Sequence, residues 1–376
     1  MVPDHKKLLS RTFRLAERGR GLVSPNPLVG AVVAQGANVV GEGCHRAFGM
    51  PHAEVEALKK AGEKAKGAVM YVNLEPCCHQ GKTPPCTGAI AAAGIREVVC
   101  AMEDPNPLVG GKGFSELEKR GIKVRKGLLK EEAERLNRYY CTSIVEKRPC
   151  IILKWAQTLD GRIASSSGDS KWVTSRKTRD FVKNLRFGVD ALLVGVETVI
   201  TDNPSLGYLP PSFQTRSSIL SRKRYYKVVC DPSLRTPFSG NIWQDDGSQV
   251  IIIVSGDLPD SRLAPYADKP NCRFIKTTFR DGRFDMREML ERMRKMDIGV
   301  IMVEGGGFTL TRFWEEGLAD EVMIFMGNRI LGGENSLPPI AGDDKEVFAM
   351  STVIEDIETR MIGDDIFLRG RPCFQG

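Results

Sequence analysis

Residues 76–86 read PCCHQGKTPPC, which places three cysteines and one histidine within eleven residues. Such a stretch can be a disulfide clip, a metal site or a rigid surface turn. The same stretch lies between two apolar segments, GAVMYVNLE at 67–75 and CTGAIAAAG at 86–94. The residues around this stretch must therefore decide which of the three it is.

The composition is that of a globular protein in a reducing compartment. The chain has 376 residues, of which 41% are hydrophobic and 27% charged, and this length favours two or three domains. No apolar run approaches the roughly 18–20 residues that span a bilayer, and the N-terminal segment lacks the apolar core of a secretory signal. We therefore expect a cytoplasmic protein without membrane contact. In that compartment ten scattered cysteines do not form a disulfide framework, so a local cluster indicates a metal or catalysis.

Strand and helix patterns alternate along the chain, which is typical of a mainly parallel sheet covered by helices. In the first part, strands are predicted at PLVGAVVAQG, ANVVGEG, GAVMYVNLE and REVVCAM. Helices are predicted after the capping residue Asp4, at HAEVEALKKAG, CTGAIAAAG and FSELEKRG, and from Lys130 to Val145. We expect an α/β fold in which the two strands of 27–43 turn at Gly36 and one helix ends at Gly62.

The segment EKRP at 146–149 marks the best domain boundary, because a second block of alternating strands and helices begins after it. We predict one domain over residues 1–146 and another over 150–376. Within the second block, DALLVGVETV at 190–199 is predicted as a strand and residues 207–224 as a long loop.

The cysteine stretch has an upstream partner in His-Ala-Glu at 52–54. Hydrolytic zinc catalysis needs three protein ligands, an open coordination position and a carboxylate that moves protons without being a ligand. His-x-Glu followed by Pro-Cys and a later Cys is the signature of zinc-dependent nucleobase deaminases. We assign His52, Cys77 and Cys86 as zinc ligands and Glu54 as the general acid and base. Both ligand segments start predicted helices, where the helix dipole favours thiolates.

Each half of this pattern has an ordinary explanation, because His-x-Glu occurs by chance and cysteines are often simply buried. Cys78 is an alternative ligand to Cys77, although the position directly after Pro76 favours Cys77. The nucleic-acid and free-nucleoside deaminases generally carry Pro-Cys-x-x-Cys, whereas six more residues separate the cysteines in this chain. That insertion contains His79, Lys82 and Thr83 and suits a phosphorylated substrate.

The chain resembles, nearly end to end, the family of bifunctional riboflavin-biosynthesis deaminase/reductases. The motifs that carry the resemblance are SPNPLVGAVV, HAEVEAL, LEPCCHQGKTPPC, DPNPLVGGKG, LKWAQTLDGRIA, GDSKWVTS, GVETVITDNPSL and VEGGG. The resemblance implies a cytidine-deaminase-like three-layer αβα domain followed by a dihydrofolate-reductase-like α/β domain. It also implies zinc-dependent deamination of 2,5-diamino-6-ribosylamino-4(3H)-pyrimidinone 5′-phosphate, followed by NADPH-dependent reduction of its ribosyl group to ribityl.

The resemblance implies six substrate contacts in the deaminase pocket, each with an ordinary structural explanation beside it, such as turn formation. They are Asn26, His45, His79, Lys82, Asp104 and Asn106. In the reaction we expect, Glu54 takes a proton from the attacking water and returns it to the departing ammonia.

The residues themselves point less clearly to the chemistry of the second block. VEGGG at 303–307 follows a predicted strand and precedes a predicted helix, so its N–H groups suit a dinucleotide phosphate. A tight turn explains the glycines nearly as well, and the run is not the G-x-G-x-x-G fingerprint. The resemblance implies cofactor contacts at Ala156, Trp172, Thr198, Asp202, Gly305, Gly306 and Gly307. It implies contacts near the substrate or cofactor at Lys154, Ser170, Arg186, Leu206 and Glu304.

One segment departs from the family pattern. Members commonly carry Thr-x-Arg after D-D/N-P-x-L, and the Arg grips the substrate phosphate; this chain reads DNPSLGYLPPSFQTR at 202–216. Leu209 stands where that Arg is expected, and the nearest replacement is Arg216, after a Pro-Pro insertion. A loop that folds back to present Arg216 is one explanation, and impaired reductase affinity is the other.

Two alternative functions follow from these features. The C-terminal block can be a binding or dimerisation module that reduces nothing, which only Leu209 supports. A deaminase of nucleic acid fits the net charge of +7, but the cysteine spacing and the aromatic content of 7% oppose it. We expect a small phosphorylated pyrimidine as the substrate, no nucleic-acid partner, and a homo-oligomer associated through the second domain.

Overall fold

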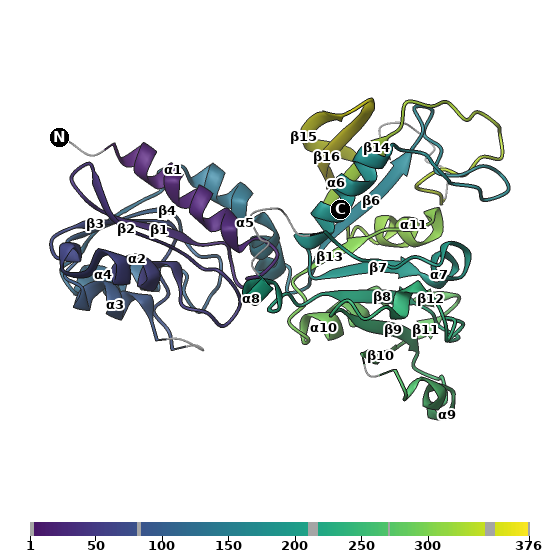
Figure 1. Ribbon diagram of the computed structural model, residues 1–376, viewed down its shortest axis with the longest axis horizontal. Coiled ribbons are helices and arrows are strands. Elements are labelled where there is room, and N and C mark those ends of the chain that lie inside the picture. Colours follow the sequence, from purple (N-terminus) through teal and green to yellow (C-terminus); the bar gives the residue numbers. More distant parts are fainter. Residues whose placement is uncertain (1–3, 81–83, 210–216, 270, 343–349, 375–376) are drawn as a thin grey trace. The chain divides into compact units, whose positions relative to one another are not determined.

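The computed structural model describes residues 4–80, 84–209, 217–269, 271–342 and 350–374 (Figure 1). The chain divides into two compact units, Met1–Lys147 with Ser212–Lys223, and Arg148–Pro211 with Arg224–Gly376. Each unit has its own sheet and its own hydrophobic core. Among the described residues, no helix combines the length and the apolar character needed to cross a membrane.

The first unit contains a five-stranded sheet. Its strands, in spatial order, are β2 (Asn38–Cys44), β1 (Gly30–Gln35), β3 (Val69–Leu74), β4 (Glu97–Met102) and β5 (Lys123–Lys126). Strand β1 runs antiparallel to both neighbours, whereas β3, β4 and β5 are parallel. The predicted turn at Gly36 is confirmed, with φ of 59°. Strand β5 was not predicted, because most of its side chains are exposed and charged.

Helices cover both faces of this sheet, which confirms the three-layer αβα architecture (Figure 1). One core includes α1 (His5–Ala16) and α5 (Lys130–Val145); the opposite core includes α2 (Ala53–Ala61), α3 (Cys86–Ala92) and α4 (Lys112–Lys119). The Asp4 carboxylate caps α1 by accepting a hydrogen bond of 3.0 Å from the Lys7 N–H. A Cβ on Gly43 would lie 2.1 Å from the Ala53 carbonyl oxygen. Only glycine therefore lets the start of α2 pack this closely on β2.

The second unit contains a nine-stranded sheet. Its strands, in spatial order, are β10 (Cys272–Thr277), β9 (Gln249–Ser255), β8 (Tyr226–Cys230), β7 (Ala191–Gly195), β13 (Val300–Val303), β6 (Cys150–Gln157), β14 (Glu321–Met326), β16 (Asp365–Cys373) and β15 (Val353–Ile362). The first seven strands are parallel, and β16 and β15 continue the sheet as an antiparallel hairpin. One large core packs this sheet against α10 (Met286–Arg294) and α11 (Gly307–Glu315).

The structure corrects the prediction of one strand over residues 190–199. Strand β7 ends at Gly195, and helix α7 (Val196–Asp202) begins directly after it. The apolar run continues across the junction because both elements are buried there, so the pattern did not reveal the change. The predicted loop of 207–224 contains a short helix, α8 (Ser217–Leu220). The β15–β16 hairpin was not predicted, since β15 is almost wholly exposed.

Candidate active sites

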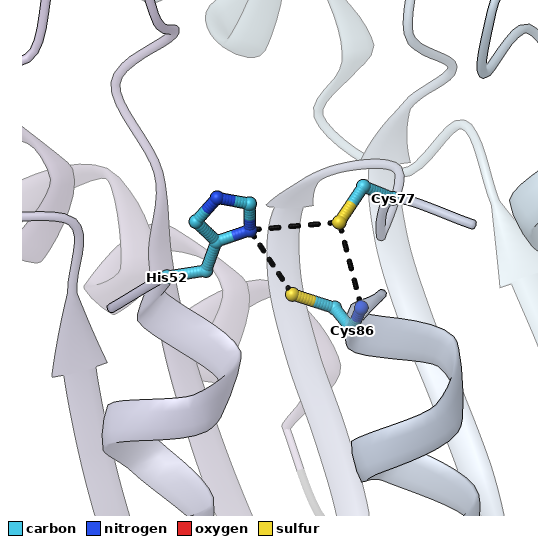
Figure 2. Close-up of side chains that lie close together, drawn as sticks. All are labelled: His52, Cys77 and Cys86. Carbon is cyan, nitrogen blue, oxygen red and sulfur yellow. Dashed lines mark hydrogen bonds between the residues drawn. The ribbon is translucent and has the colours of Figure 1, made fainter. Parts of the chain in front are cut away.

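The three residues assigned as zinc ligands come together in the first unit (Figure 2). His52 precedes α2, Cys86 is the first residue of α3, and Cys77 lies in the segment after β3. The Nδ1 atom of His52 lies 3.2 Å from the sulfur of Cys86 and 3.5 Å from that of Cys77. All three donor atoms lie within 4.8 Å of one another. Within the described residues, no other group of three or more such side chains comes as close together.

These donors fit a zinc ion. Tetrahedral bonds of about 2.3 Å to sulfur and about 2.0–2.1 Å to nitrogen place neighbouring donors about 3.5–3.8 Å apart. The measured separations between His52 and the two sulfurs are 3.2 and 3.5 Å, so a small movement of the side chains accommodates the ion. Cys78, the alternative ligand, does not belong to this group.

The two thiols differ in acidity because they touch each other. A hydrogen bond from the Cys86 thiol, with His52 assisting, lowers the pKa of Cys77 to about 4 although burial acts in the opposite direction. The same contact, together with burial, raises the pKa of Cys86. The backbone N–H of Cys86 also donates to the Cys77 sulfur over 3.4 Å. The site therefore stabilises one thiolate, the form that binds metals.

Glu54 lies beside this donor group without belonging to it. It is the second residue of α2 and only 4% exposed. Burial raises the pKa of its carboxyl above the usual value, while His52 and Cys86 act in the opposite direction. A buried carboxyl with a raised pKa suits proton transfer near neutral pH.

Asn26 and His45 form a hydrogen-bonded pair next to His52. The Nδ1 of His45 lies 3.1 Å from the Pro51 carbonyl oxygen and must donate to it, so Nε2 accepts from the Asn26 amide over 3.1 Å. Burial lowers the pKa of His45 to about 4, so this ring is neutral at pH 7. Its ring meets that of His52 edge-on at 5.5 Å. The structure thus brings Asn26 and His45 to the donor group.

Asp104 and Asn106 lie in the segment between β4 and α4. Asp104 is buried, and its Oδ1 accepts from the Tyr140 hydroxyl and from the Asn106 N–H, both over 2.9 Å. Burial raises the pKa of Asp104 to about 6. The ring of His79 contributes to the electrostatic surroundings of Asp104, and its buried Nδ1 makes no hydrogen bond with the described residues. Lys82, the remaining predicted contact, lies outside the described residues.

The sequence analysis missed Glu75, which anchors the segment that carries Asp104. Its buried carboxylate accepts four backbone hydrogen bonds of 2.9–3.2 Å. The donors are the N–H groups of Asp104, Gly111, Gly113 and Phe114. A buried acidic residue between an apolar strand and Pro-Cys was the only sequence signal, and it does not reveal the distant partners.

Two buried asparagines anchor the segment that carries Asn26. The Asn73 amide donates to the Leu28 carbonyl oxygen over 2.8 Å, and its oxygen accepts from the Gly30 N–H. Asn137 accepts from the Leu28 N–H over 2.8 Å and donates to the Leu28 carbonyl oxygen over 3.0 Å. Both backbone groups of Leu28 are therefore held by side chains, and neither asparagine was predicted.

In the second unit, Lys154, Arg186 and Glu304 form a largely buried ion network. Both carboxylate oxygens of Glu304 accept from Arg186 over 2.9 Å, and Lys154 lies 3.3 Å away. Burial disfavours the charged carboxylate, but the Arg186 and Lys154 charges outweigh it and lower the pKa of Glu304 to about 2. The structure thus joins three predicted residues from β6, from α6 (Arg176–Phe187) and from the end of β13.

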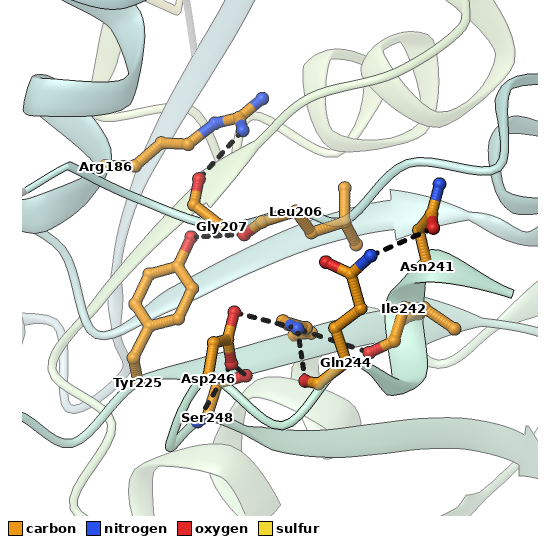
Figure 3. Close-up of polar contacts among 10 residues, drawn as sticks. Arg186, Leu206, Gly207, Tyr225, Asn241, Ile242, Gln244, Asp246 and Ser248 are labelled. Atoms are coloured by element: carbon orange, nitrogen blue, oxygen red, sulfur yellow. Dashed lines mark hydrogen bonds and ion pairs between the residues drawn. The ribbon is translucent and has the colours of Figure 1, made fainter.

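The segment around Leu206 is held by the same region (Figure 3). Arg186 donates to the Gly207 carbonyl oxygen over 3.0 Å. The Tyr225 hydroxyl donates to the Leu206 carbonyl oxygen over 3.1 Å. The N–H of Leu209, the position where the family pattern has Arg, donates to the Lys183 carbonyl oxygen over 3.0 Å. Arg216 lies outside the described residues.

A fully buried lysine, Lys227, was also missed from the sequence and lies on β8. The Lys227 ammonium donates to the carbonyl oxygens of Ile242 and Gln244 over 3.2 and 3.4 Å. It also forms an ion pair of 3.0 Å with Asp246. All three of its donors are therefore used.

The predicted cofactor residues gather only in part. Gly305–Gly307 connect β13 to α11, and a Cβ on Gly305, which has φ of 135°, would lie 3.2 Å from the Thr198 hydroxyl. The structure thus brings Thr198 to the glycine turn. The exposed Trp172 stacks under the Arg179 guanidinium at 4.0 Å, and Asp202 lies 3.9 Å from the Lys171 ammonium. Within the part of the chain that the structure describes, no hydrogen bond, ion pair or ring contact joins Ala156, on β6, or the exposed Ser170 to this group.

Both units match known families. Residues 149–368 match the RibD C-terminal domain, and residues 2–102 match the cytidine and deoxycytidylate deaminase zinc-binding region. The fold and sites therefore define a two-unit enzyme with a zinc-binding deaminase half and a reductase half.

Full-length relatives identify the family. The chain is 41% identical to riboflavin biosynthesis protein RibD of Aquifex aeolicus (strain VF5), over 87% of this chain and 88% of the relative. It is 36% identical to RibD of Escherichia coli (strain K12), over 96% and 97%. A structure of Acinetobacter baumannii RibD superimposes with a TM-score of 0.86 at 31% identity, covering 98% and 99%. The chain belongs to the RibD family of riboflavin biosynthesis enzymes.

One relative with a solved structure is named for both activities. The Thermotoga maritima protein, a diaminohydroxyphosphoribosylaminopyrimidine deaminase/5-amino-6-(5-phosphoribosylamino)uracil reductase, superimposes with a TM-score of 0.81 at 32% identity, covering 98% of this chain and 99% of that one. The present chain is a bifunctional deaminase and reductase of riboflavin biosynthesis, and its cofactors are Zn²⁺ and NADPH. The predicted fold class and enzyme class are confirmed.

Proposed function

We propose that residues 1–146 deaminate 2,5-diamino-6-ribosylamino-4(3H)-pyrimidinone 5′-phosphate, and that residues 150–376 reduce the ribosyl group of the product to ribityl with NADPH. The observation that carries the deaminase half is the cluster of His52, Cys77 and Cys86 beside the buried Glu54. The observation that supports the reductase half is the buried network of Lys154, Arg186 and Glu304.

In the deaminase half, His52, Cys77 and Cys86 would hold zinc, with Glu54 outside the ligand set. When bound, zinc acts as a Lewis acid and lowers the pKa of a water molecule to about 7. Glu54 takes the proton of the water that attacks the amino-bearing ring carbon and returns it to the departing nitrogen, which leaves as ammonia. His45 accepts from the Asn26 amide nitrogen and so orients the Asn26 oxygen to accept from the substrate.

The remaining deaminase residues would bind the rest of the substrate. His79 and Lys82 belong to the segment between the two cysteine ligands and suit the phosphate. Asp104 and Asn106 offer oxygen acceptors to N–H or O–H groups. Glu75 holds their segment in place through four backbone hydrogen bonds, so it acts on the substrate only through that segment.

In the reductase half, Glu304 holds the cations Lys154 and Arg186 at the segment of Leu206, where an anionic substrate benefits from them. Arg216 is proposed to bind the phosphate in place of the arginine missing at position 209, and Ser170 to contact the substrate. Gly305–Gly307, Thr198, Ala156, Trp172 and Asp202 are proposed to line the cofactor site. The cofactor carries the hydride chemistry, so the protein needs only to position it.

We further infer that the enzyme works in the cytoplasm as a homo-oligomer without a nucleic-acid partner. Three large apolar side chains on the edge strand β15, Val353, Ile357 and Met361, are more than half exposed. Exposed apolar groups on a sheet edge favour association between copies. Light scattering of the purified enzyme tests this inference, and a monomer at micromolar concentration would contradict it.

Mass spectrometry of the substrate tests the proposed function. The zinc-loaded wild-type enzyme and Glu54→Gln are incubated with the diaminopyrimidinone phosphate, without and with NADPH. We expect wild type to replace the amino group by oxygen in both samples and to add two hydrogens only with NADPH. Glu54→Gln should retain zinc but deaminate about 10²–10⁴ times more slowly.

The matched control is Glu56→Gln, because Glu56 lies two positions after Glu54 on the same helix. This variant should deaminate like wild type. Normal turnover by zinc-loaded Glu54→Gln would overturn the role of Glu54. Deamination without any reduction would show that the altered 207–216 segment has removed the second activity.

A further inference from the structure

The carboxylate of Asp104 is held on one side only. Its Oδ1 accepts both the Tyr140 hydroxyl and the Asn106 N–H, each over 2.9 Å. Within the described residues, no hydrogen bond reaches Oδ2, and this oxygen is not among the fully buried polar atoms that lack a partner. The side chain therefore has one oxygen fixed by the protein and one that remains for a ligand.

Tyr140 comes from helix α5, which packs on the face of the sheet opposite to α2 and α3. One helical turn earlier, Asn137 is buried and holds both backbone groups of Leu28. Residues three apart lie on the same side of a helix. A single face of α5 thus reaches two segments proposed to bind substrate, the one with Asn26 and the one with Asp104.

The match to the cytidine and deoxycytidylate deaminase zinc-binding region ends at residue 102. Asp104, its segment and the whole of α5 lie beyond that match. The zinc ligands and Glu54 lie within it. The zinc ligands and Glu54 are therefore separate in sequence from Asp104, its segment and α5.

We propose that Tyr140 is a positioning residue of the deaminase, whose hydroxyl holds Oδ1 of Asp104 and thereby presents Oδ2 to an N–H or O–H group of the pyrimidine substrate. The inference rests on the substrate-binding role proposed above for Asp104. It extends the deaminase site to α5 and makes this helix a determinant of substrate affinity.

The electrostatics of the site agree with this role. Burial and the neighbouring Asp104 raise the pKa of Tyr140, so its hydroxyl stays protonated and donates. Burial raises the pKa of Asp104 to about 6, whereas its bonds with Asn106 and Tyr140 act in the opposite direction. Among the other titratable groups that face Asp104, Glu75 raises its pKa and His79 lowers it, and the thiols of Cys141 and Cys100 lie in the same electrostatic surroundings. Loss of the Tyr140 hydroxyl must therefore raise the pKa of Asp104 further.

The test is a double-mutant cycle in the full-length, zinc-loaded enzyme. Wild type, Tyr140→Phe, Asp104→Asn and the double variant are compared for kcat and KM of deamination across pH. A hydrogen bond to a charged group corresponds to a change of about 10- to 100-fold. We expect Tyr140→Phe to raise KM within that range with kcat within about 3-fold of wild type, and to move the acid limb of kcat/KM to higher pH. In the Asp104→Asn background, Tyr140→Phe should change neither quantity.

Tyr139→Phe is the matched control, because it removes a hydroxyl from the neighbouring residue of the same helix; its KM should equal that of wild type. Zinc content and reduction of already deaminated substrate, which should be unchanged in Tyr140→Phe, report an intact fold. Equal effects of Tyr140→Phe in both backgrounds, or no effect on KM, would overturn the inference while leaving Asp104 in its role. A normal KM for Asp104→Asn would overturn both.

Discussion

The deaminase and reductase units organise their buried polar groups in different ways. Around the candidate zinc site, His45 and the segments that carry Asn26 and Asp104 are held largely by hydrogen bonds to backbone groups. At the candidate reductase site, opposite charges neutralise one another in the network of Lys154, Arg186 and Glu304.

The difference reflects what each site must bind. A metal site needs a few residue types in a compact pattern, and the groups around the ligands hold them in place. A site for an anionic substrate needs cations that stay charged when buried, and these require a counter-ion from elsewhere in the chain.

The largest effect should come from removing a metal ligand. Cys86→Ala should lose zinc and all measurable deamination, because two ligands do not complete the site. Reduction of deaminated substrate should persist, since the reductase contacts lie in the other unit. Metal analysis by mass spectrometry and two separate activity assays measure this. Cys78→Ala is the control, and zinc loss from this variant would contradict the choice of Cys77 as ligand.

Glu304→Gln should have the next largest effect. It leaves the buried charges of Lys154 and Arg186 without their counter-charge, which costs about 3–5 kcal/mol of unfolding free energy, and it should abolish reduction while deamination continues. Denaturant unfolding checks the stability. Glu358→Gln, which breaks the exposed pair with Arg369, should cost at most about 1 kcal/mol. Equal costs would show that burial adds nothing to the stability that the Glu304 network contributes.

The difference in stability between wild type and Glu304→Gln should depend on pH. The pKa of Glu304 is about 2 in the folded protein and 4.5 ordinarily. The charged carboxylate therefore stabilises the fold fully above about pH 4.5, and this contribution disappears as the pH falls towards 2. The stability difference between wild type and Glu304→Gln should shrink over that window. A constant difference would show that the charge of Glu304 is not what matters.

Glu75→Gln should have a smaller effect, confined to the deaminase. The amide nitrogen of glutamine cannot accept two of the four backbone hydrogen bonds, which costs about 1–3 kcal/mol. We expect a raised KM for deamination with normal zinc content, measured by steady-state kinetics. Glu103→Gln is the control, because Glu103 lies in the segment that carries Asp104 but is about half exposed. Loss of zinc from Glu75→Gln would show that this residue supports the metal site instead.

The smallest effect should come from Lys227→Met. The substitution leaves the carbonyl oxygens of Ile242 and Gln244 without this donor, but Asp246 is partly exposed and regains water. We expect a loss of about 1–2 kcal/mol in urea unfolding and a modest rise of the reductase KM. Lys295→Met, at the exposed C-cap of α10, should be neutral. A loss as large as that of Glu304→Gln would show that Asp246 behaves as a buried charge.

The sequence revealed the elements whose signals are local. The helix from Ala53 to Ala61 and the strand before Cys77 were predicted because capping residues, glycines and apolar periods lie within a few positions of one another. The zinc ligands were assigned for the same reason, since each follows a recognisable strand or starts a helix. At Val196 the predicted strand was wrong, because a buried strand and a short buried helix both appear as a continuous apolar run in the sequence.

The residues that were missed depend on partners far away in the chain. Glu75 bonds to groups 29–39 positions later, and Asn137 to a residue 109 positions earlier. Lys227 is a charged residue in an apolar strand, and nothing near it in sequence shows that Asp246 will neutralise it. Such pairs arise from tertiary packing, so a single sequence does not reveal them.

The tripeptide Glu75-Pro76-Cys77 has a consequence for enzyme engineering. It joins Cys77, the first cysteine of the candidate zinc site, to Glu75, which anchors the segment that carries Asp104. The backbone of Gly113 packs closely on it, because a Cβ on Gly113 would lie 2.2 Å from the Pro76 carbonyl oxygen. A library aimed at new pyrimidine substrates should therefore keep residues 75–77 and Gly113 constant. It can instead vary Leu108, which lies in the segment of Asp104 and is 62% exposed, so that a new side chain there leaves this frame intact.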